Sequence, residues 1–119
     1  MTLRWTPIRV LVYRHPVDMR KQMDGLSALV AAELGCDPAD RTAYIFIGRC
    51  GKRVKVLLWH LNGYWLLYKR LESQRFHWPD WFGENDTIEL DIEQMDYLLD
   101  GYDLNGMRPH HERLYAHGF

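Results

Sequence analysis

Aromatic rings and positive charges occur together in the middle of this sequence. The run WHLNGYWLLYKR, residues 59–70, holds two Trp and two Tyr and ends in Lys69 and Arg70. Three more cations lie just before it, in the run RCGKR at residues 49–53. Exposed rings can stack on bases while Lys and Arg neutralise phosphates, so this combination is typical of a nucleic-acid interface. The alternative is an ordinary amphipathic sheet that buries its rings.

Residues that could support catalysis are present, but their spacing forms no recognisable site. His110 and His111 are adjacent, and neighbouring residues of an extended chain point in opposite directions, so the pair is poorly placed to share a metal ion. Cys50 lies beside cations that would lower its pKa, yet no His or acid is placed to activate it. The acids that could be imagined as a metal cluster are at positions ordinary for solvated carboxylates: Asp18, Asp24, Asp37 and Asp40. We therefore expect no enzyme, no bound metal and no cofactor.

The elements that would position these side chains follow from the hydrophobic pattern. Six runs rich in β-branched and aromatic residues predict strands over residues 8–13, 43–48, 54–60, 64–71, 75–78 and 87–90. Helical spacing predicts a helix that begins at Asp18 as N-cap and ends at Gly35. A second predicted helix begins at Asp91, with Gln94 completing a capping box, and ends at Gly101.

This order predicts a single α+β domain over residues 1–101. Short turns between consecutive strands favour an antiparallel β-meander of about five to six strands, which could curl into a half-barrel. The N-terminal helix would pack against it and the C-terminal helix would be short. Residues 102–119 show no periodicity, so we expect an arm or a flexible tail.

The dipeptide Asn62-Gly63 predicts a two-residue hairpin turn, and the turn sets the register. In that register Lys55 lies opposite Arg70, and like charges opposite one another destabilise a sheet unless an anion or a carboxylate lies between them. One face then carries aliphatic residues and would be covered by the first helix: Ile45, Ile47, Val54, Val56, Leu58, Leu67, Leu71 and Phe76. The other face mixes rings and cations: Tyr44, Phe46, Lys55, Leu57, Trp59, Tyr64, Leu66, Tyr68, Arg70 and His77.

The mixed face and the adjoining loop are the predicted nucleic-acid-binding site. Phosphate contacts are expected from Arg49, Lys52, Arg53, Lys55 and Arg70, with Trp59 and Tyr68 as stacking platforms. The competing interpretation is that the second helix or the first strand covers this face. In that case Tyr44, Phe46, Trp59 and Tyr68 form a second core layer.

The charge of the 119-residue chain is unevenly distributed, although its net value is −1. Residues 1–75 hold thirteen Lys or Arg against six Asp or Glu, whereas residues 76–119 hold two against ten. The asymmetry suggests a basic surface for nucleic acid, unless the acidic part pairs with the basic part in the fold. No run approaches a membrane span or a signal peptide, and Cys36 and Cys50 suit reduced thiols, so we expect a cytoplasmic protein.

Several motifs resemble one known family. They are VDMRK at residues 17–21, DGL at 24–26, YIFIGR at 44–49, and VKVLLWHLNGYWLLYKRLESQRFHWP at 54–79. Together these motifs look like the small TnpB-type accessory protein, the second open reading frame, of bacterial insertion sequences of family sixty-six. That family is distinct from the RNA-guided nucleases that share the TnpB name. The resemblance spans about residues 7–101.

The resemblance implies a protein that is encoded beside a separate transposase and is needed for efficient movement of the element. It implies DNA and that transposase as partners, and it assigns the strand-transfer active site to the transposase. Two roles are therefore expected: DNA binding through the basic and aromatic face, or a protein–protein adaptor that docks on the transposase without touching DNA.

Overall fold

The computed structural model describes residues 7, 9–79 and 85–104. Within them the chain forms β1 (Arg9–Tyr13), α1 (Met23–Glu33), β2 (Thr42–Ile47), β3 (Arg53–His60), β4 (Gly63–Arg70), β5 (Thr87–Leu90) and α2 (Ile92–Leu99). Neither of the two helices seen in this part of the chain is long and apolar enough to cross a membrane.

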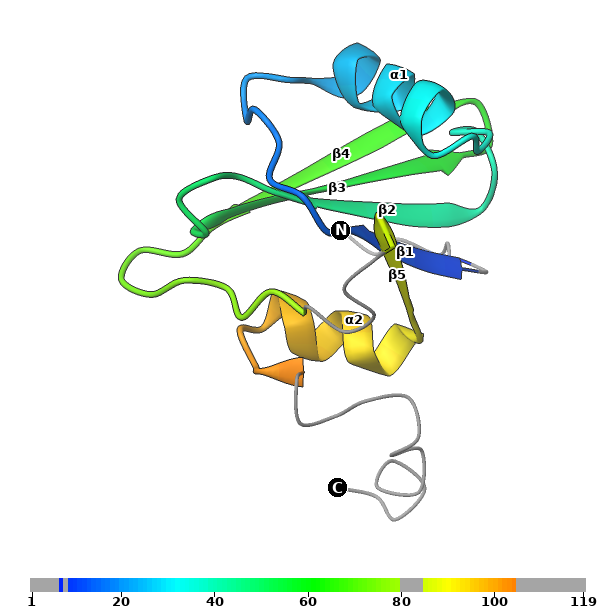
Figure 1. Cartoon of the computed structure of the whole chain (residues 1–119). Coiled ribbons are helices and arrows are strands. Elements are labelled where there is room, and N and C mark those ends of the chain that lie inside the picture. The colour runs from blue at the N-terminus through cyan, green and yellow to red at the C-terminus, as the bar shows by residue number, and fades with distance from the viewer. Residues whose placement is uncertain (1–6, 8, 80–84, 105–119) are drawn as a thin grey trace.

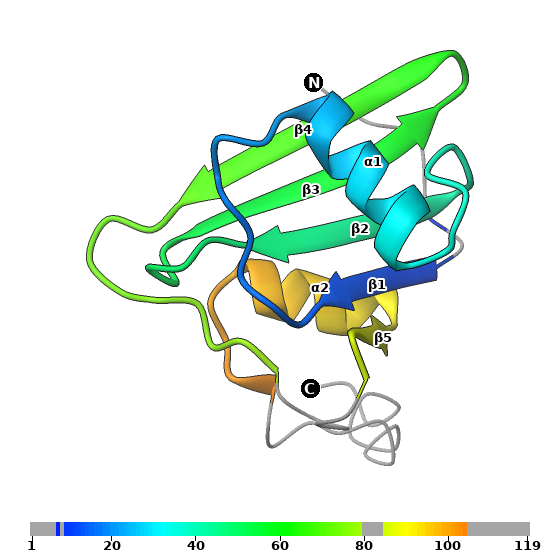
Figure 2. The same ribbon diagram turned by 45° about the horizontal axis from the view of Figure 1, so that its top comes forward.

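The five strands form one open, mixed sheet in the order β4-β3-β2-β1-β5 (Figure 2). The β2–β3, β3–β4 and β1–β5 pairs are antiparallel, as expected for hairpins, but β1 and β2 are parallel. The predicted meander is therefore wrong, because α1 gives the chain the length it needs to return and lay β2 parallel to β1. The sheet is open at both edges and is not closed into a barrel.

The predicted strand over residues 75–78 is also absent. The segment after β4 instead leaves the sheet and passes to the layer of α2, as Figures 1 and 2 both show. The Phe76 N–H donates to the Gly51 carbonyl at 2.8 Å, and the Trp78 indole N–H donates to the Tyr13 carbonyl at 3.3 Å. These two bonds fix the segment across the sheet and place Phe76 in the core.

The two helices cover opposite faces of the sheet (Figure 1). On the α1 side the buried cluster is Leu11, Tyr13, Val17, Leu26, Val30, Tyr44, Phe46 and Leu57. On the α2 side it is Val10, Val12, Ala43, Ile45, Ile47, Val54, Val56, Leu58, Phe76, Ile88, Leu90, Leu98 and Leu104. The first helix thus covers the face that we expected to be open, and α2 covers the aliphatic face. Both faces carry apolar side chains that must be buried, and periodicity alone does not predict which helix covers which face.

The helix ends follow local chemistry. At α2 the Asp91 carboxylate accepts the Gln94 N–H at 2.7 Å and the Gln94 side chain accepts the Asp91 N–H at 3.0 Å, so the predicted capping box is confirmed. α1 begins at Met23, later than predicted, with Gln22 as N-cap. Asp18 instead closes a separate turn, because its carboxylate accepts the Arg20 N–H at 2.9 Å.

The β3–β4 hairpin turns one residue earlier than Asn62-Gly63 predicts. His60 pairs with Gly63, so Leu61 and Asn62 form the loop, and Leu61 takes a positive φ of 57°. Every partner therefore shifts by two positions, an even number that leaves each side chain on its predicted face. Lys55 faces Tyr68, and Arg53 faces Arg70.

Candidate nucleic-acid interface

An open hollow of about 780 Å³ lies on the α1 side of the sheet, beside the end of β2 and over β3 and β4. Its walls come from the segment before α1, from the β2–β3 turn, and from β3 and β4. The lining residues are Asp18, Met19, Arg20, Gln22, Gly48, Arg49, Cys50, Arg53, Lys55, Leu66 and Tyr68. Four of them are cations and one is a carboxylate.

The chain before α1 is held tightly against the end of β2. The Val17 N–H donates to the Ile47 carbonyl at 2.8 Å, and Val17 bridges Gly48 in parallel. A Cβ on Gly48 would lie 2.6 Å from Met19 Cγ, so only glycine allows this approach. Gly51 supplies the positive φ, 76°, that the following turn needs. Gly48 thus allows the segment before α1 to approach the end of β2, and Gly51 allows the turn beside it.

Lys55 forms the floor of the hollow. It is only 5% exposed, and its ammonium donates to the Met19 and Lys21 carbonyls, both at 2.8 Å. The same ammonium lies 5.7 Å from the centre of the Tyr68 ring, which favours a cation. Burial lowers the pKa of Lys55 below its usual value, and the Asp18 charge offsets this only in part. Lys55 therefore joins β3 to the segment before α1 and keeps one N–H available.

Two arginines lie opposite each other at the rim. Arg53 and Arg70 are cross-strand partners, and the neighbouring Leu71 N–H bonds the Lys52 carbonyl. This places the two arginines in a non-hydrogen-bonded pair, the type that brings side chains closer. Arg70 is partly neutralised by Glu72, 3.0 Å away, which raises the pKa of Arg70. No described carboxylate forms an ion pair with Arg53. The like-charge pair predicted between Lys55 and Arg70 therefore exists between Arg70 and Arg53, two residues before Lys55.

Arg20 and Asp18 form the opposite wall. The Asp18 carboxylate accepts N–H groups from the Arg20 guanidinium at 2.7, 3.0 and 3.1 Å. These bonds hold the pKa of Asp18 well below its usual range. The single carboxylate of the hollow is thus already bound to one of its four cations.

The β2–β3 turn presents Arg49, Cys50 and Lys52. Arg49 and Cys50 are exposed and line the hollow, whereas Lys52 lies on the turn beside it. The pKa of Cys50 is lowered, chiefly by a hydrogen bond from the Lys52 backbone N–H and then by the charge of Arg53. The Cys50 thiol is therefore accessible, and its pKa depends on the charges in the hollow.

The aromatic residues of the mixed face separate into three environments. Tyr44 and Phe46 are buried beneath α1, as the second-layer interpretation expects. Tyr68 is 53% exposed at the edge of the hollow. Trp59 lies half-buried at the other end of β3, where its ring meets that of Tyr64 edge-on at 5.1 Å.

The surroundings of Trp59 differ from those of the hollow. Burial raises the pKa of Tyr64, and the charges of Asp37 and Asp40 raise it further, so carboxylates lie near this end. The structure thus brings Arg49, Arg53, Lys55 and Tyr68 together, with Lys52 and Arg70 beside them, and leaves Trp59 apart.

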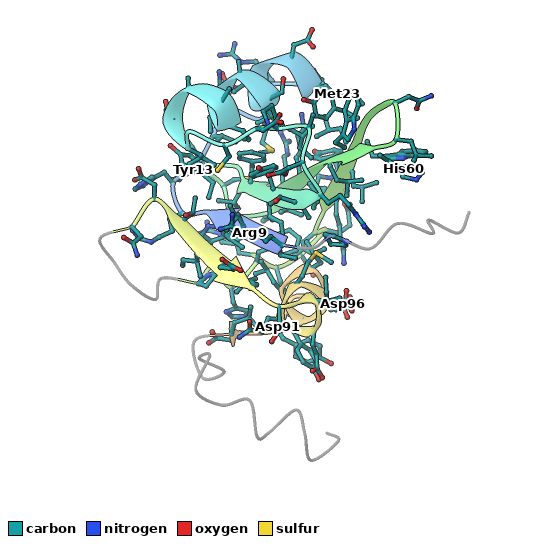
Figure 3. The ribbon with its side chains drawn as sticks, turned by 90° about the vertical axis from the view of Figure 1, so that its right-hand side faces the viewer. Arg9, Tyr13, Met23, His60, Asp91 and Asp96 are labelled. Atoms are coloured by element: carbon teal, nitrogen blue, oxygen red, sulfur yellow. The ribbon has the colours of Figure 1, made fainter. Side chains whose placement is uncertain are left out.

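Among the described residues, no carboxylate of the acidic C-terminal part lines the hollow. The described ion pairs of this part with the basic part lie elsewhere, between Glu89 and Arg9 at 3.2 Å and between Asp86 and His15 at 2.9 Å. Figure 3 shows Asp91 and Asp96 on the far side of the sheet from α1. His110 and His111 lie outside the described residues. Within the described residues no group of three or more His, Cys, Asp or Glu could hold a metal ion.

Sequence reasoning missed the segment at residues 18–22 as part of this site. It assigned Asp18 and Arg20 to a helix, whereas they form a wall of the hollow. The signal was the order strand, helix, strand at the start of the chain. Such a unit places the segment after its first strand beside the end of its second, and ligands commonly bind there.

The fold and this hollow define a small α+β protein with an open cationic surface beside the end of β2. The chain belongs to the IS66 Orf2-like family: the family model described as "IS66 Orf2 like protein" matches residues 8–109. It is therefore an insertion-sequence accessory protein, distinct from the RNA-guided nuclease TnpB.

Two curated relatives come from Sinorhizobium fredii (strain NBRC 101917 / NGR234). One, uncharacterized protein y4hO, is 34% identical over 96 residues, which cover 81% of this chain and 82% of the relative. The other, uncharacterized protein y4jC, is 31% identical over 96 residues, covering 81% and 80%. No solved structure matches the chain.

Proposed function

We propose that this accessory protein acts without enzymatic activity, by binding DNA through the cationic hollow and its rim. Phosphates along the DNA would contact Arg49, Lys52, Arg53 and Arg70 at the rim. A phosphate that enters the hollow would contact Lys55 at its floor, and a base could stack on Tyr68. Trp59 lies six residues from Arg53 along β3, about 20 Å, so it would meet only a strand that follows the sheet.

The observation that carries the proposal is the pairing of Arg53 with Arg70 across the β3–β4 ladder. A fold that places like charges opposite one another, in the closer type of pair, loses stability. Glu72 relieves one of the two charges only. A bound phosphate would neutralise the other charge. The pairing of the two arginines is therefore explained if this surface binds an anion.

Binding measured against salt tests this proposal with two matched double variants. Arg49→Ala with Arg53→Ala removes two charges at the hollow. Arg9→Ala with Arg41→Ala removes two at the opposite ends of β1 and β2. We expect the first to weaken binding to duplex DNA at least tenfold at about 150 mM salt. It should also make the slope of log K against log salt shallower by about 2, at about 0.9 per phosphate contact.

The control double variant should change the affinity no more than two- to threefold, because it alters net charge without touching the hollow. Equal losses in both variants would reduce the effect to net charge and contradict a local interface. DNA binding that is absent from the native protein would overturn the proposal.

The adaptor role has one observation in its favour. β4 is one of the two edge strands of the sheet, and its Leu67 side chain is 40% exposed. An uncovered edge with apolar side chains can accept a strand from another protein. Co-purification with the transposase that survives nuclease treatment, and is lost in Leu67→Lys, would support this role. The adaptor role would replace DNA binding only if the native chain had no measurable DNA affinity.

A further inference from the structure

The hollow has the position of a ligand site in strand–helix–strand units. β1 and β2 are parallel neighbours joined through α1, and the hollow lies beside the carboxyl end of β2, between the segment before α1 and strands β3 and β4. Ligands bind at such ends because the loops diverge there and the helix that follows presents its N-terminus. Gln22, the N-cap of the eleven-residue α1, lines the hollow and makes no side-chain cap. The positive end of the helix dipole therefore adds to the charge of the hollow.

The charge of the hollow calls for an anion. Arg20, Arg49, Arg53 and Lys55 line it against Asp18 alone, and Asp18 is bound to Arg20. Arg49 and Arg53 are exposed and make no ion pair with any carboxylate of the described chain. Arginine forks suit the oxygens of a phosphate group, which they can contact in bidentate fashion.

The depth of the hollow selects the form of that anion. Lys55 lies at the floor and is nearly buried, with two of its three N–H donors bound to backbone carbonyls. A duplex lying across the rim would reach Arg49 and Arg53 but not this floor. A phosphate at the end of a chain can enter, since its three terminal oxygens are free to accept from Lys55 below and the arginines above.

We propose that the hollow is a binding site for one phosphate monoester, supplied by the end of a nucleic-acid strand. The strand-end source rests on the proposed DNA binding, whereas the phosphate chemistry rests on the hollow itself. Free phosphate and a terminal phosphate share that chemistry, so the experiment separates them.

Alkylation of Cys50 reports occupancy of the hollow in the full chain. Iodoacetamide reacts with the thiolate, and a bound phosphate would both shield Cys50 and raise its pKa. We expect saturating inorganic phosphate to slow the modification of Cys50 at least threefold, while potassium chloride at equal ionic strength does not. Peptide mass spectrometry separates Cys50 from the half-buried Cys36, whose rate should stay constant.

Arg53→Gln and Arg9→Gln form a matched pair of variants. Each removes one exposed positive charge, but only Arg53 lines the hollow, whereas Arg9 pairs with Glu89 at the opposite end of the sheet. Protection of Cys50 by phosphate should disappear in Arg53→Gln and persist in Arg9→Gln. Both residues are exposed, so both variants are expected to fold, which circular dichroism checks. Protection that is absent in the native chain, or equal in the two variants, would overturn the phosphate site.

Fluorescence anisotropy with single-stranded oligonucleotides identifies the source. We expect a 5′-phosphorylated strand to bind at least fivefold more tightly than the same strand with a 5′-hydroxyl, and this ratio should collapse in Arg53→Gln. Equal binding of both strands would overturn the strand-end source and leave DNA binding standing. Protection by phosphate without binding of either strand would support the phosphate site and overturn the proposed DNA binding.

Discussion

At the scale of single residues, Lys55 has two tasks that the sequence does not separate. Its ammonium donates to the Met19 and Lys21 carbonyls, so it holds the segment before α1 against β3. It also forms the floor of the cationic hollow. A lysine in the middle of a strand predicts a charged surface, and the pattern gave no sign that backbone carbonyls would surround it.

Lys55→Met should destabilise the fold by about 1–3 kcal/mol. The methionine fills a similar volume, but the Met19 and Lys21 carbonyls lose their donor. Lys52→Met, half-exposed on the neighbouring turn, is the control and should cost no more than about 0.5 kcal/mol. Urea unfolding followed by circular dichroism measures both values. Equal stability of the two variants would show that the Lys55 bonds contribute nothing.

Tyr13→Phe should remove part of the loss of stability at alkaline pH. Burial, followed by the hydrogen bond from the Tyr13 hydroxyl to Glu33 at 2.7 Å, raises the pKa of Tyr13 from 10.0 to about 12. Because the folded-state pKa is the higher one, the stabilising contribution is complete below pH 10 and is lost as the pH rises through 12. The two-unit shift sets an upper limit of about 3 kcal/mol, and solvent screening of the part-buried hydroxyl lowers the contribution to about 1 kcal/mol.

Urea unfolding of the native chain and of Tyr13→Phe at pH 8, 10, 11 and 12 checks this prediction. The native chain should lose its advantage over the variant progressively above pH 10. Other groups that titrate in this range, among them Lys55 with its lowered pKa, affect both proteins and cancel in the difference. A difference that stays constant from pH 8 to 12 would contradict the role assigned to Tyr13.

At the scale of elements, the β3–β4 hairpin shows what a local signal decides. Asn62-Gly63 correctly predicts a hairpin, yet the turn centres on Leu61 and Asn62. The side-chain faces survived this error because the partners shift by an even number. The capping box of α2 was predictable because its bonds join residues three apart. The start of α1 was not, since the preceding segment is fixed by β2 and Lys55, which are distant in sequence.

Gly63→Ala separates the observed turn from the predicted one. In the structure Gly63 begins β4 without a positive φ, and a Cβ there would meet nothing within 4 Å. The substitution should therefore be neutral or stabilise by up to about 1 kcal/mol, since alanine restricts the unfolded chain. In a type I′ turn centred on Asn62-Gly63, alanine would need a positive φ and would destabilise by about 1 kcal/mol or more. The sign of the change in urea midpoint decides between the two.

At the scale of the whole molecule, the order of the layers determines which side chains of the sheet are buried and which are exposed. The sequence predicted five of the strands, both helices and the two faces of the sheet. It did not predict that β1 would lie between β2 and β5, or that α1 would cover the mixed face. As a result Tyr44 and Phe46 became core, while Arg53 and Tyr68, beyond the reach of α1, stayed open. Such choices depend on contacts between distant segments, which a single sequence does not display.

The same layer order separates the charges, with the basic hollow on the α1 side and acidic side chains on α2. The layers of such a fold are about 10 Å apart, and salt screens exposed charges beyond about 8 Å at physiological ionic strength. Glu72→Lys at the rim should therefore raise the affinity for DNA at least threefold at 150 mM salt, because it also frees Arg70. Asp96→Lys on α2, an equal change in net charge, should raise it less than 1.5-fold. Similar increases in DNA affinity in both variants would mean that net charge alone attracts DNA. That result would contradict the hollow as the DNA interface.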